Sequence, residues 1–317
     1  MTAGVLPRAQ PGTVRVLHWM PAIAALGLGI APSAGAQSME PLSYSNAPIG
    51  LNFLIMGATH QSGSVLVDPT VPVKDVKAVV YTATLAYSRV IDFWGQSGSL
   101  ALVVPTARLS ASGEVFDQAR SISRTGLADL TARLAINLFG APALSLSEFA
   151  SYRQDTIVGA TLLVTAPSGQ YDPTRLVNIG TNRWSFKPEL GISKALGPWT
   201  LEAAAGITFF TDNDQFLGNG VRQQDPLYSI QGHAIYNVNP RFWAALDGTY
   251  YTGGRTTVNG SAGNDRQSNS RWGATLAYSL DRMNSIKGYF SSGVSARTGT
   301  DFKIVGIAWQ YRWGAGL

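Results

Sequence analysis

The sequence predicts an all-β protein, a transmembrane antiparallel up-and-down β-barrel of about 12 strands. Three observations predict this fold: apolar and polar residues alternate with a period of two, the alternating segments are long, and only 14% of the 317 residues are charged. A soluble domain carries about 25% charged residues, so this chain has too few charges for a fully hydrated surface. The same composition excludes a disordered chain, and beyond the N-terminal region no apolar run is long enough for a transmembrane helix.

Charge and cysteine content exclude further classes of protein. The net charge is +5, and the basic residues are too scattered for a nucleic-acid-binding surface. The chain has no cysteine, which excludes disulfides, thiolate metal sites and cysteine nucleophiles.

The first 36 residues have the pattern of a cleavable signal peptide. Arg8 and Arg15 form a basic region, residues 20–31 are apolar, and Ala34-Gly35-Ala36 supplies a small-x-small cleavage site. We therefore expect export and location in a bacterial outer membrane. Residues 37–48 form a short N-terminal extension before the barrel (residues 49–317). Because residues 37–47 are too few for a hatch domain, no plug is expected.

The strands are predicted from the alternation. In residues 199–204, Trp, Leu and Ala alternate with Thr, Glu and Ala, a spacing of two that differs from the three-to-four spacing of a helix. Such segments match the roughly 9–11 tilted residues that cross a bilayer. In chain order they lie near residues 49–58, 76–92, 98–109, 125–138, 150–165, 182–195, 198–211, 226–238, 241–252, 269–281, 285–297 and 301–313.

The connections fall into two alternating classes, as expected for short periplasmic turns and long outer loops. The tight turns lie at 94–98, 195–198, 237–241 and 281–285, and the long polar connections at 59–75, 110–124, 166–181, 212–225 and 253–268. Two connections depart from this alternation, since 139–149 is long for a turn and 297–301 is short for a loop. The sequence therefore predicts the number of strands to within two.

Aromatic residues near the strand ends indicate a membrane rather than a soluble sandwich or lectin. Six tryptophans are expected to form girdles at the headgroup level: Trp184, Trp199, Trp243, Trp272, Trp309 and Trp313. The segment 306–313, Gly-Ile-Ala-Trp-Gln-Tyr-Arg-Trp, resembles the terminal-strand signal that the outer-membrane assembly machinery binds, although the chain continues for four more residues.

Three blocks carry a resemblance to a known family: 165–172 (TAPSGQYD), 176–184 (LVNIGTNRW) and 186–189 (FKPE). Together with 209–213, 251–254 and 309–313, they resemble the transporter family of the phenol meta-cleavage pathway. The resemblance covers most of the chain from about residue 48 onward. It implies an outer-membrane β-barrel distantly similar to channels for fatty acids and toluene, set in lipid and lipopolysaccharide and carrying a small aromatic or hydrophobic solute.

Charged residues on the polar strand faces are expected to point into the barrel, because an Arg or Lys at the lipid midplane costs roughly 2–4 kcal/mol. They either line a wet path and set ion selectivity, or pair across the lumen and hold the barrel closed. The residues predicted to line the lumen are Arg153, Asp155, Arg183, Lys187, Glu189, Glu202, Asp247, Arg271 and Lys287.

Apolar residues are predicted at the extracellular mouth, where aromatic rings suit a phenol ring. These are Phe210, Phe216, Leu217 and Tyr251; their neighbours Phe209 and Tyr250 are assigned instead to the outer aromatic girdle.

Catalytic chemistry has little support. His60 is placed in an outer loop and His233 on a strand, where Ser229 is four residues away, about 13 Å and too far for a hydrogen bond. No catalytic residue, metal or cofactor is predicted, and Asp212-Asn213-Asp214 is interpreted as a solvated turn.

These observations favour a non-enzymatic channel for passive uptake of small hydrophobic or aromatic compounds. A general small-solute porin, an outer-membrane lipid hydrolase and a closed structural barrel are the alternatives. The oligomeric state stays open.

Overall fold

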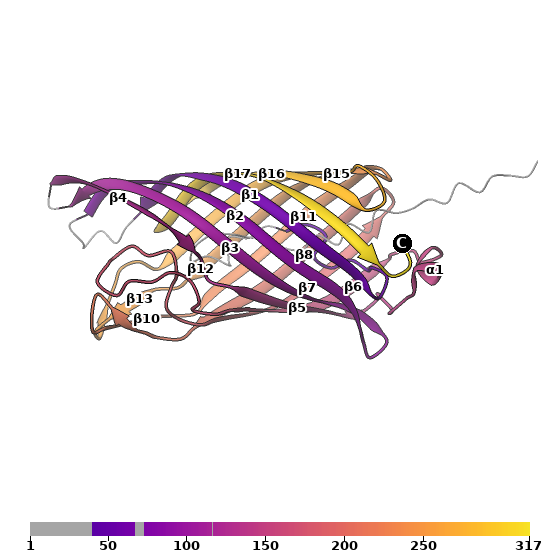
Figure 1. Ribbon diagram of the computed structural model, residues 1–317, viewed down its shortest axis with the longest axis horizontal. Coiled ribbons are helices and arrows are strands. Elements are labelled where there is room, and N and C mark those ends of the chain that lie inside the picture. The colour runs from indigo at the N-terminus through magenta and orange to yellow at the C-terminus, as the bar shows by residue number, and fades with distance from the viewer. Residues whose placement is uncertain (1–39, 67–72, 116) are drawn as a thin grey trace, which may run out of the picture.

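The chain folds into a closed antiparallel β-barrel of 12 strand positions, which confirms the predicted fold class (Figure 1). The computed structural model describes residues 40–66, 73–115 and 117–317. The barrel strands are β1 (Leu51–Leu66), β2 (Val73–Phe93), β3 (Gln96–Val115), β4 (Gln118–Leu127), β5 (Thr131–Phe139), β6 (Thr156–Thr165), β7 (Ser185–Leu196), β8 (Trp199–Phe210), β11 (Leu227–Asn239), β12 (Phe242–Gly253), β15 (Gln267–Ser279), β16 (Asn284–Ser295) and β17 (Gly299–Gly314).

Two pairings complete the wall. The last strand β17 pairs with β1 from Leu51 opposite Gly314 to Leu66 opposite Gly299, so the cylinder has no free edge at this seam. Strands β4 and β5 share one position, because β4 pairs with the outer part of β3 and β5 with its inner part. A closed wall satisfies the backbone groups that hydrocarbon cannot.

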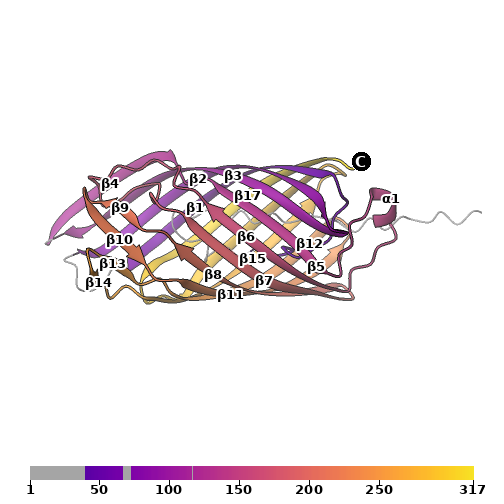
Figure 2. The same cartoon turned by 90° about the horizontal axis from the view of Figure 1, so that it is seen from below.

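The two ends of the barrel differ. One end, called here the inner end, carries the short turns, the C-terminus and the single-turn helix α1 (Leu146–Phe149) (Figures 1 and 2). The other, the outer end, carries a four-stranded sheet of β9 (Asn213–Phe216), β10 (Gly220–Gln224), β13 (Thr256–Val258) and β14 (Ser261–Ala262). Helix α1 explains the long connection at 139–149, and a capping box between Ser145 and Glu148 starts it.

Nearly all predicted strands lie within a few residues of the observed ones, but the predicted outer loops at 59–75 and 110–124 are wrong. Strands β1 to β4 continue through much of these stretches, and His60 lies on β1 with its ring 4.8 Å from that of Tyr81. The residues of β4 are polar on both faces, so this part of the wall has no apolar stripe by which the sequence could reveal it. Likewise β9, β10, β13 and β14 lie in predicted loops.

The two faces of the wall are chemically opposite. Large apolar side chains are exposed on the outside, such as Leu190 (62%), Leu246 (60%) and Ile307 (58%), while polar residues are buried inside. Trp243 corrects the predicted girdle: it is fully buried and packs with Ile235 inside the barrel. Its position follows from the period of two, since Trp243 and Asp247 share a strand face.

Residues 40–50, called here the inner segment, precede β1 and lie inside the barrel wall. Ala47 belongs to a buried cluster with Leu51 and Phe53, and Leu42 packs against the cluster that contains Trp243. The extension is short, as predicted, but its residues pack inside the barrel near the inner end. The predicted signal peptide lies outside the described residues, and in the described part no helix is long and apolar enough to span a membrane.

Candidate channel lumen

A row of three ionisable residues crosses neighbouring strands in one register. Glu202 on β8 lies opposite His233 on β11, which lies opposite Asp247 on β12. His233 Nδ1 is 2.7 Å from Asp247 Oδ1, and Thr275 Oγ1 donates to Asp247 Oδ2 at 2.8 Å. All four side chains are buried, so the hydrogen bonds offset the cost of removing the charges from water.

A second cluster lies on β7. Lys187 Nζ is 3.0 Å from Glu189 Oε2, and both side chains are about 7% exposed. Gln231 Nε2 also donates to Glu189 Oε2, at 3.3 Å. These contacts pair the interior charges with neighbouring side chains along the wall.

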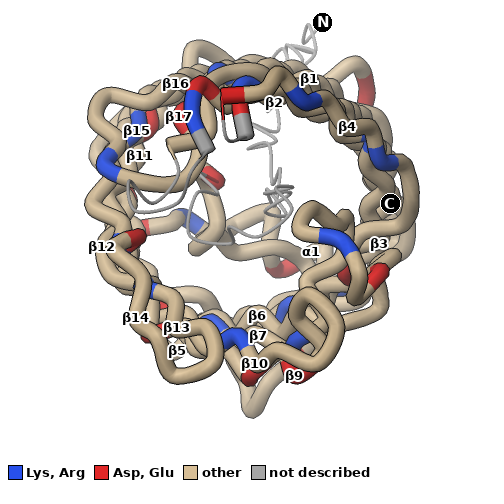
Figure 3. Tube along the Cα trace, turned by 90° about the vertical axis from the view of Figure 1, so that its left-hand side faces the viewer, with Lys and Arg blue, Asp and Glu red and all other residues tan. Residues whose placement is uncertain are grey.

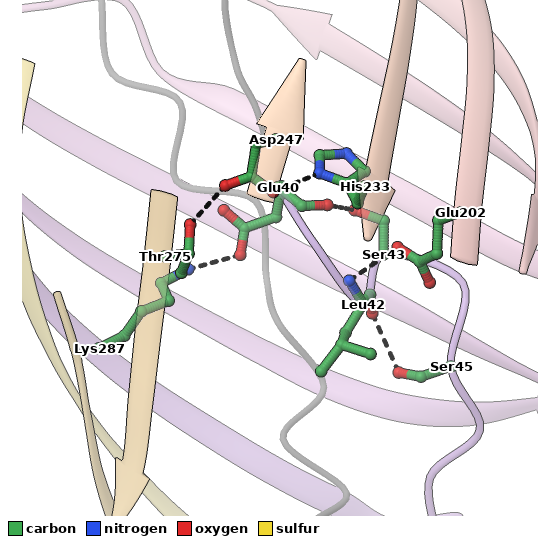
Figure 4. Close-up of polar contacts among 9 residues, drawn as sticks. All are labelled: Glu40, Leu42, Ser43, Ser45, Glu202, His233, Asp247, Thr275 and Lys287. Carbon is green, nitrogen blue, oxygen red and sulfur yellow. Dashed lines mark hydrogen bonds and ion pairs between the residues drawn. The ribbon is translucent and has the colours of Figure 1, made fainter. Parts of the chain in front are cut away.

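The inner segment is held by charged residues of the wall (Figure 4). Glu40 forms an ion pair with Lys287 on β16, and the backbone N–H of Leu42 donates to Glu202 Oε2 at 2.7 Å. Burial raises the pKa of the Glu40 carboxyl, which Lys287 opposes. Figure 4 shows the His233–Asp247–Thr275 chain beside these anchors, so the segment and the charged row form one polar network.

Tyr44 fills a groove made by two glycines. Gly159 on β6 pairs with Gly191 on β7, and a Cβ at Gly191 would lie 2.0 Å from the Tyr44 ring. The Tyr44 hydroxyl donates to Glu189 Oε1 at 3.0 Å. The missing side chains of the glycine pair thus let the ring lie flat against the wall.

The predicted lumen residues separate into two groups. Arg153 and Asp155 are exposed in the connection after α1, where Asp155 pairs with Lys194, so they do not face the lumen. They lie outside any strand, and alternation therefore does not apply to them. The other seven are buried or nearly so on the inner side of the barrel or just before a strand: Arg183, Lys187, Glu189, Glu202, Asp247, Arg271 and Lys287.

The predicted mouth residues also separate. Tyr251 is 1% exposed and packs with Leu227, and Phe210 packs against this pair, so these rings lie inside the wall near the outer end. Phe216 ends β9, and Leu217 is exposed in the turn that follows. The structure therefore brings Phe210 and Tyr251 together and places the other two in the outer sheet.

Arg133 on β5, Glu40 and Tyr44 are lumen residues that the sequence analysis missed. Arg133 is 7% exposed on a predicted strand, and the lipid-facing cost of a charge would have placed it inside. It lines a cavity of about 40 Å³ with Leu42, Ser45, Phe53 and Asn137. No periodicity marks Glu40 and Tyr44, which bind residues far away in the sequence.

The described residues do not bring Ser229 and His233 together as a nucleophile and base. Ser229 Oγ donates to the Gly206 carbonyl at 3.4 Å rather than to His233, and His233 Nε2 has no partner among the described residues. Within the described ranges no three His, Asp or Glu residues are grouped to hold a metal.

Comparisons place this barrel among known proteins. The profile of the family described as "Putative MetA-pathway of phenol degradation" matches residues 59–311, whereas no curated protein sequence matches the chain. The COG4313 outer membrane channel from Pseudomonas putida F1 superposes with a TM-score of 0.73 at 21% identity, over 86% of this chain and 99% of that one. The β domain of the Bordetella autotransporter BrkA gives 0.50 at 10% identity, over 84% and 99%. At these identities the likeness shows a shared fold.

Proposed function

Since the chain belongs to the phenol-degradation MetA-pathway family, we propose that it is an outer-membrane channel that carries small aromatic or hydrophobic solutes inward by passive diffusion. The observation that carries this proposal is the opposite chemistry of the two faces of the wall. The outside is apolar and suited to lipid, while the inside is lined with buried polar and charged side chains.

The inner face near the outer end supports an aromatic solute. Phe210 is half-buried on the inner face near the outer end, where it packs against the buried Leu227 and Tyr251. A ring entering from outside can stack on the Phe210 ring, and aromatic pairs contribute about 0.5–1.5 kcal/mol beyond the area they bury.

The outer face of the barrel also indicates which membrane components would contact it. Its apolar belt fits outer-membrane lipid and lipopolysaccharide, and the aromatic end of β17 fits recognition by the barrel assembly machinery. We expect no energy source to be coupled to transport.

Flux into liposomes that carry the refolded protein tests the proposal. Phenol-like solutes are compared with sugars and amino acids of similar size, and protein-free liposomes correct for leakage of phenols through lipid. Faster flux of the aromatic solutes supports the proposal. Flux that depends only on size indicates a general porin, and no flux indicates a closed structural barrel.

A further inference from the structure

Two arginines lie beside each other near the outer end, each over a phenylalanine ring. The Arg183 guanidinium carbon is 4.5 Å from the centre of the Phe210 ring, and that of Arg222 is 5.3 Å from the centre of the Phe216 ring. Arg183 lies two residues before the start of β7, and Arg222 lies on β10 of the outer sheet. Figure 3, which looks into the outer end, shows basic positions gathered beside β7 and β10.

The hydrogen-bonding capacity of this pair is largely unused. Arg183 Nη2 donates to the side-chain oxygen of Gln224, whose own Nε2 donates to the Gly254 carbonyl. Arg183 Nη1 is buried and has no partner among the described residues. Arg222 makes no hydrogen bond or ion pair with any residue that the structure describes. A buried guanidinium N–H without an acceptor is costly, so the pair is suited to an anion.

The nearby carboxylates are engaged elsewhere. Asp129 accepts from the backbone N–H groups of Gly169 and Thr181, both at 2.8 Å, and from Thr181 Oγ1 at 2.6 Å. Asp212 accepts from Gln223 Nε2 at 2.9 Å. Asp265, the carboxylate nearest in effect to Arg222, accepts from the backbone N–H of Thr256 at 2.8 Å and from its hydroxyl at 2.6 Å. None of the three carboxylates forms a salt bridge with the arginines, so the two positive charges lie near each other without an ion pair among the described residues.

The pKa of Arg183 is consistent with a second positive charge nearby. Burial, and next the neighbouring Arg222, lower the pKa of Arg183 to about 10. The side chain is still protonated at neutral pH, and an anion placed between the two arginines would relieve their repulsion.

An apolar surface adjoins the arginine pair. Phe210, which lies under Arg183, also packs against the buried Leu227 and Tyr251. A ligand that touches both parts needs a negative charge at one end and a flat apolar body at the other.

We propose that Arg183 and Arg222 form an anion subsite for aromatic carboxylates, with the carboxylate between the two guanidinium groups and the ring against the half-buried Phe210. This inference rests on the proposed function and narrows its substrate class. At neutral pH a benzoate-type acid is ionised, since carboxyl groups titrate at about pH 4. A phenol is neutral at that pH, because its pKa is about 10. The subsite therefore selects the acid over the phenol, and the Phe210 ring selects it over acetate.

Isothermal titration of the refolded full-length protein in detergent tests the subsite, with sodium benzoate, sodium acetate and phenol as probes. Wild-type protein is expected to bind benzoate at least about tenfold more tightly than either other probe, because charge-assisted hydrogen bonds and ring contact act together. This comparison needs no mutation, so it stands even if a variant does not fold.

Arg222→Gln and Arg183→Gln remove one charge each and are expected to weaken benzoate binding about tenfold. The matched control is Arg255→Gln, which removes the same charge from an exposed outer residue whose Nε lies 3.4 Å from Asp225. The control is expected to bind benzoate as wild type does. Heat-modifiable migration on gels verifies that each variant is folded.

Equal binding of benzoate and phenol, or equal loss in Arg222→Gln and Arg255→Gln, would overturn the subsite. The outcome is separate from that of the transport assay. Benzoate binding without any solute flux would refute the channel and keep the subsite, whereas aromatic flux without preferential benzoate binding would keep the channel and refute the subsite.

Discussion

Single residues inside the barrel are held by specific partners, and Asp247 is the clearest case. Its two carboxylate oxygens engage His233 and Thr275, and its side chain is 2% exposed. Such a residue connects three strands, β11, β12 and β15, through one side chain.

Asp247→Ala is therefore expected to destabilise the barrel by about 2–5 kcal/mol, because it leaves the buried polar groups of His233 and Thr275 without a partner. The midpoint of urea unfolding, followed on gels by the loss of the heat-modifiable form, measures the change. The control Asp117→Asn breaks an exposed ion pair with Lys74 and should leave the midpoint unchanged. Equal midpoints for both variants would show that the Asp247 network contributes nothing to stability.

Two adjacent phenylalanines allow a matched test of stacking on Phe210. Phe210 faces inward with Leu227 and Tyr251, whereas Phe209 is 45% exposed on the other face of β8. Phe210→Ala is expected to lower the aromatic-to-sugar flux ratio several-fold in liposomes, since it removes the stacking surface. Phe209→Ala should keep the wild-type ratio. A ratio that changes equally in both variants would argue against stacking on Phe210.

At the scale of elements, the barrel strands could be predicted because lipid on one side and a polar lumen on the other enforce alternation. Strand β4 and the short strands of the outer sheet lack a continuous apolar face, so they look like loops in the sequence. The inner segment could not be predicted, since its contacts depend on tertiary structure: Leu42 and Glu202 are 160 residues apart. Arg153 and Asp155 were misplaced for a related reason, because the strand begins after them.

The contact between the inner segment and the wall depends on the paired glycines of β6 and β7. Gly191→Ala is expected to displace Tyr44, because the new Cβ would lie 2.0 Å from its ring. The chain has no cysteine, so a Ser45→Cys substitution introduces a unique thiol whose rate of maleimide labelling reports the position of the segment. Labelling should be several-fold faster when Gly191→Ala is added.

Gly248→Ala is the control for this experiment, because nothing lies within 4 Å of the Cβ it would add. Its labelling rate should equal that of Ser45→Cys alone. If Gly191→Ala also leaves the rate unchanged, the Tyr44 contact does not hold the segment.

At the scale of the whole molecule, the barrel has a graded interior. Arg183 and Arg222 lie near the outer end without an ion pair among the described residues, whereas Glu40, Glu202 and Asp247 lie nearer the inner end, where Lys287 pairs with Glu40. The sequence predicts the barrel and the inward orientation of most of these charged residues. It does not predict that residues 40–50 of the chain narrow the lumen from within.

Single-channel conductance in planar bilayers measures whether the inner segment narrows the lumen. Wild-type protein is compared with a variant that lacks residues 40–47, both refolded and verified by heat-modifiable migration. The structure predicts small resolved current steps for wild type and steps at least about twofold larger for the deletion, because the inner segment and its ion pair with Lys287 are gone. Equal steps would show that the segment does not narrow the path, and no steps in either protein would contradict a channel altogether.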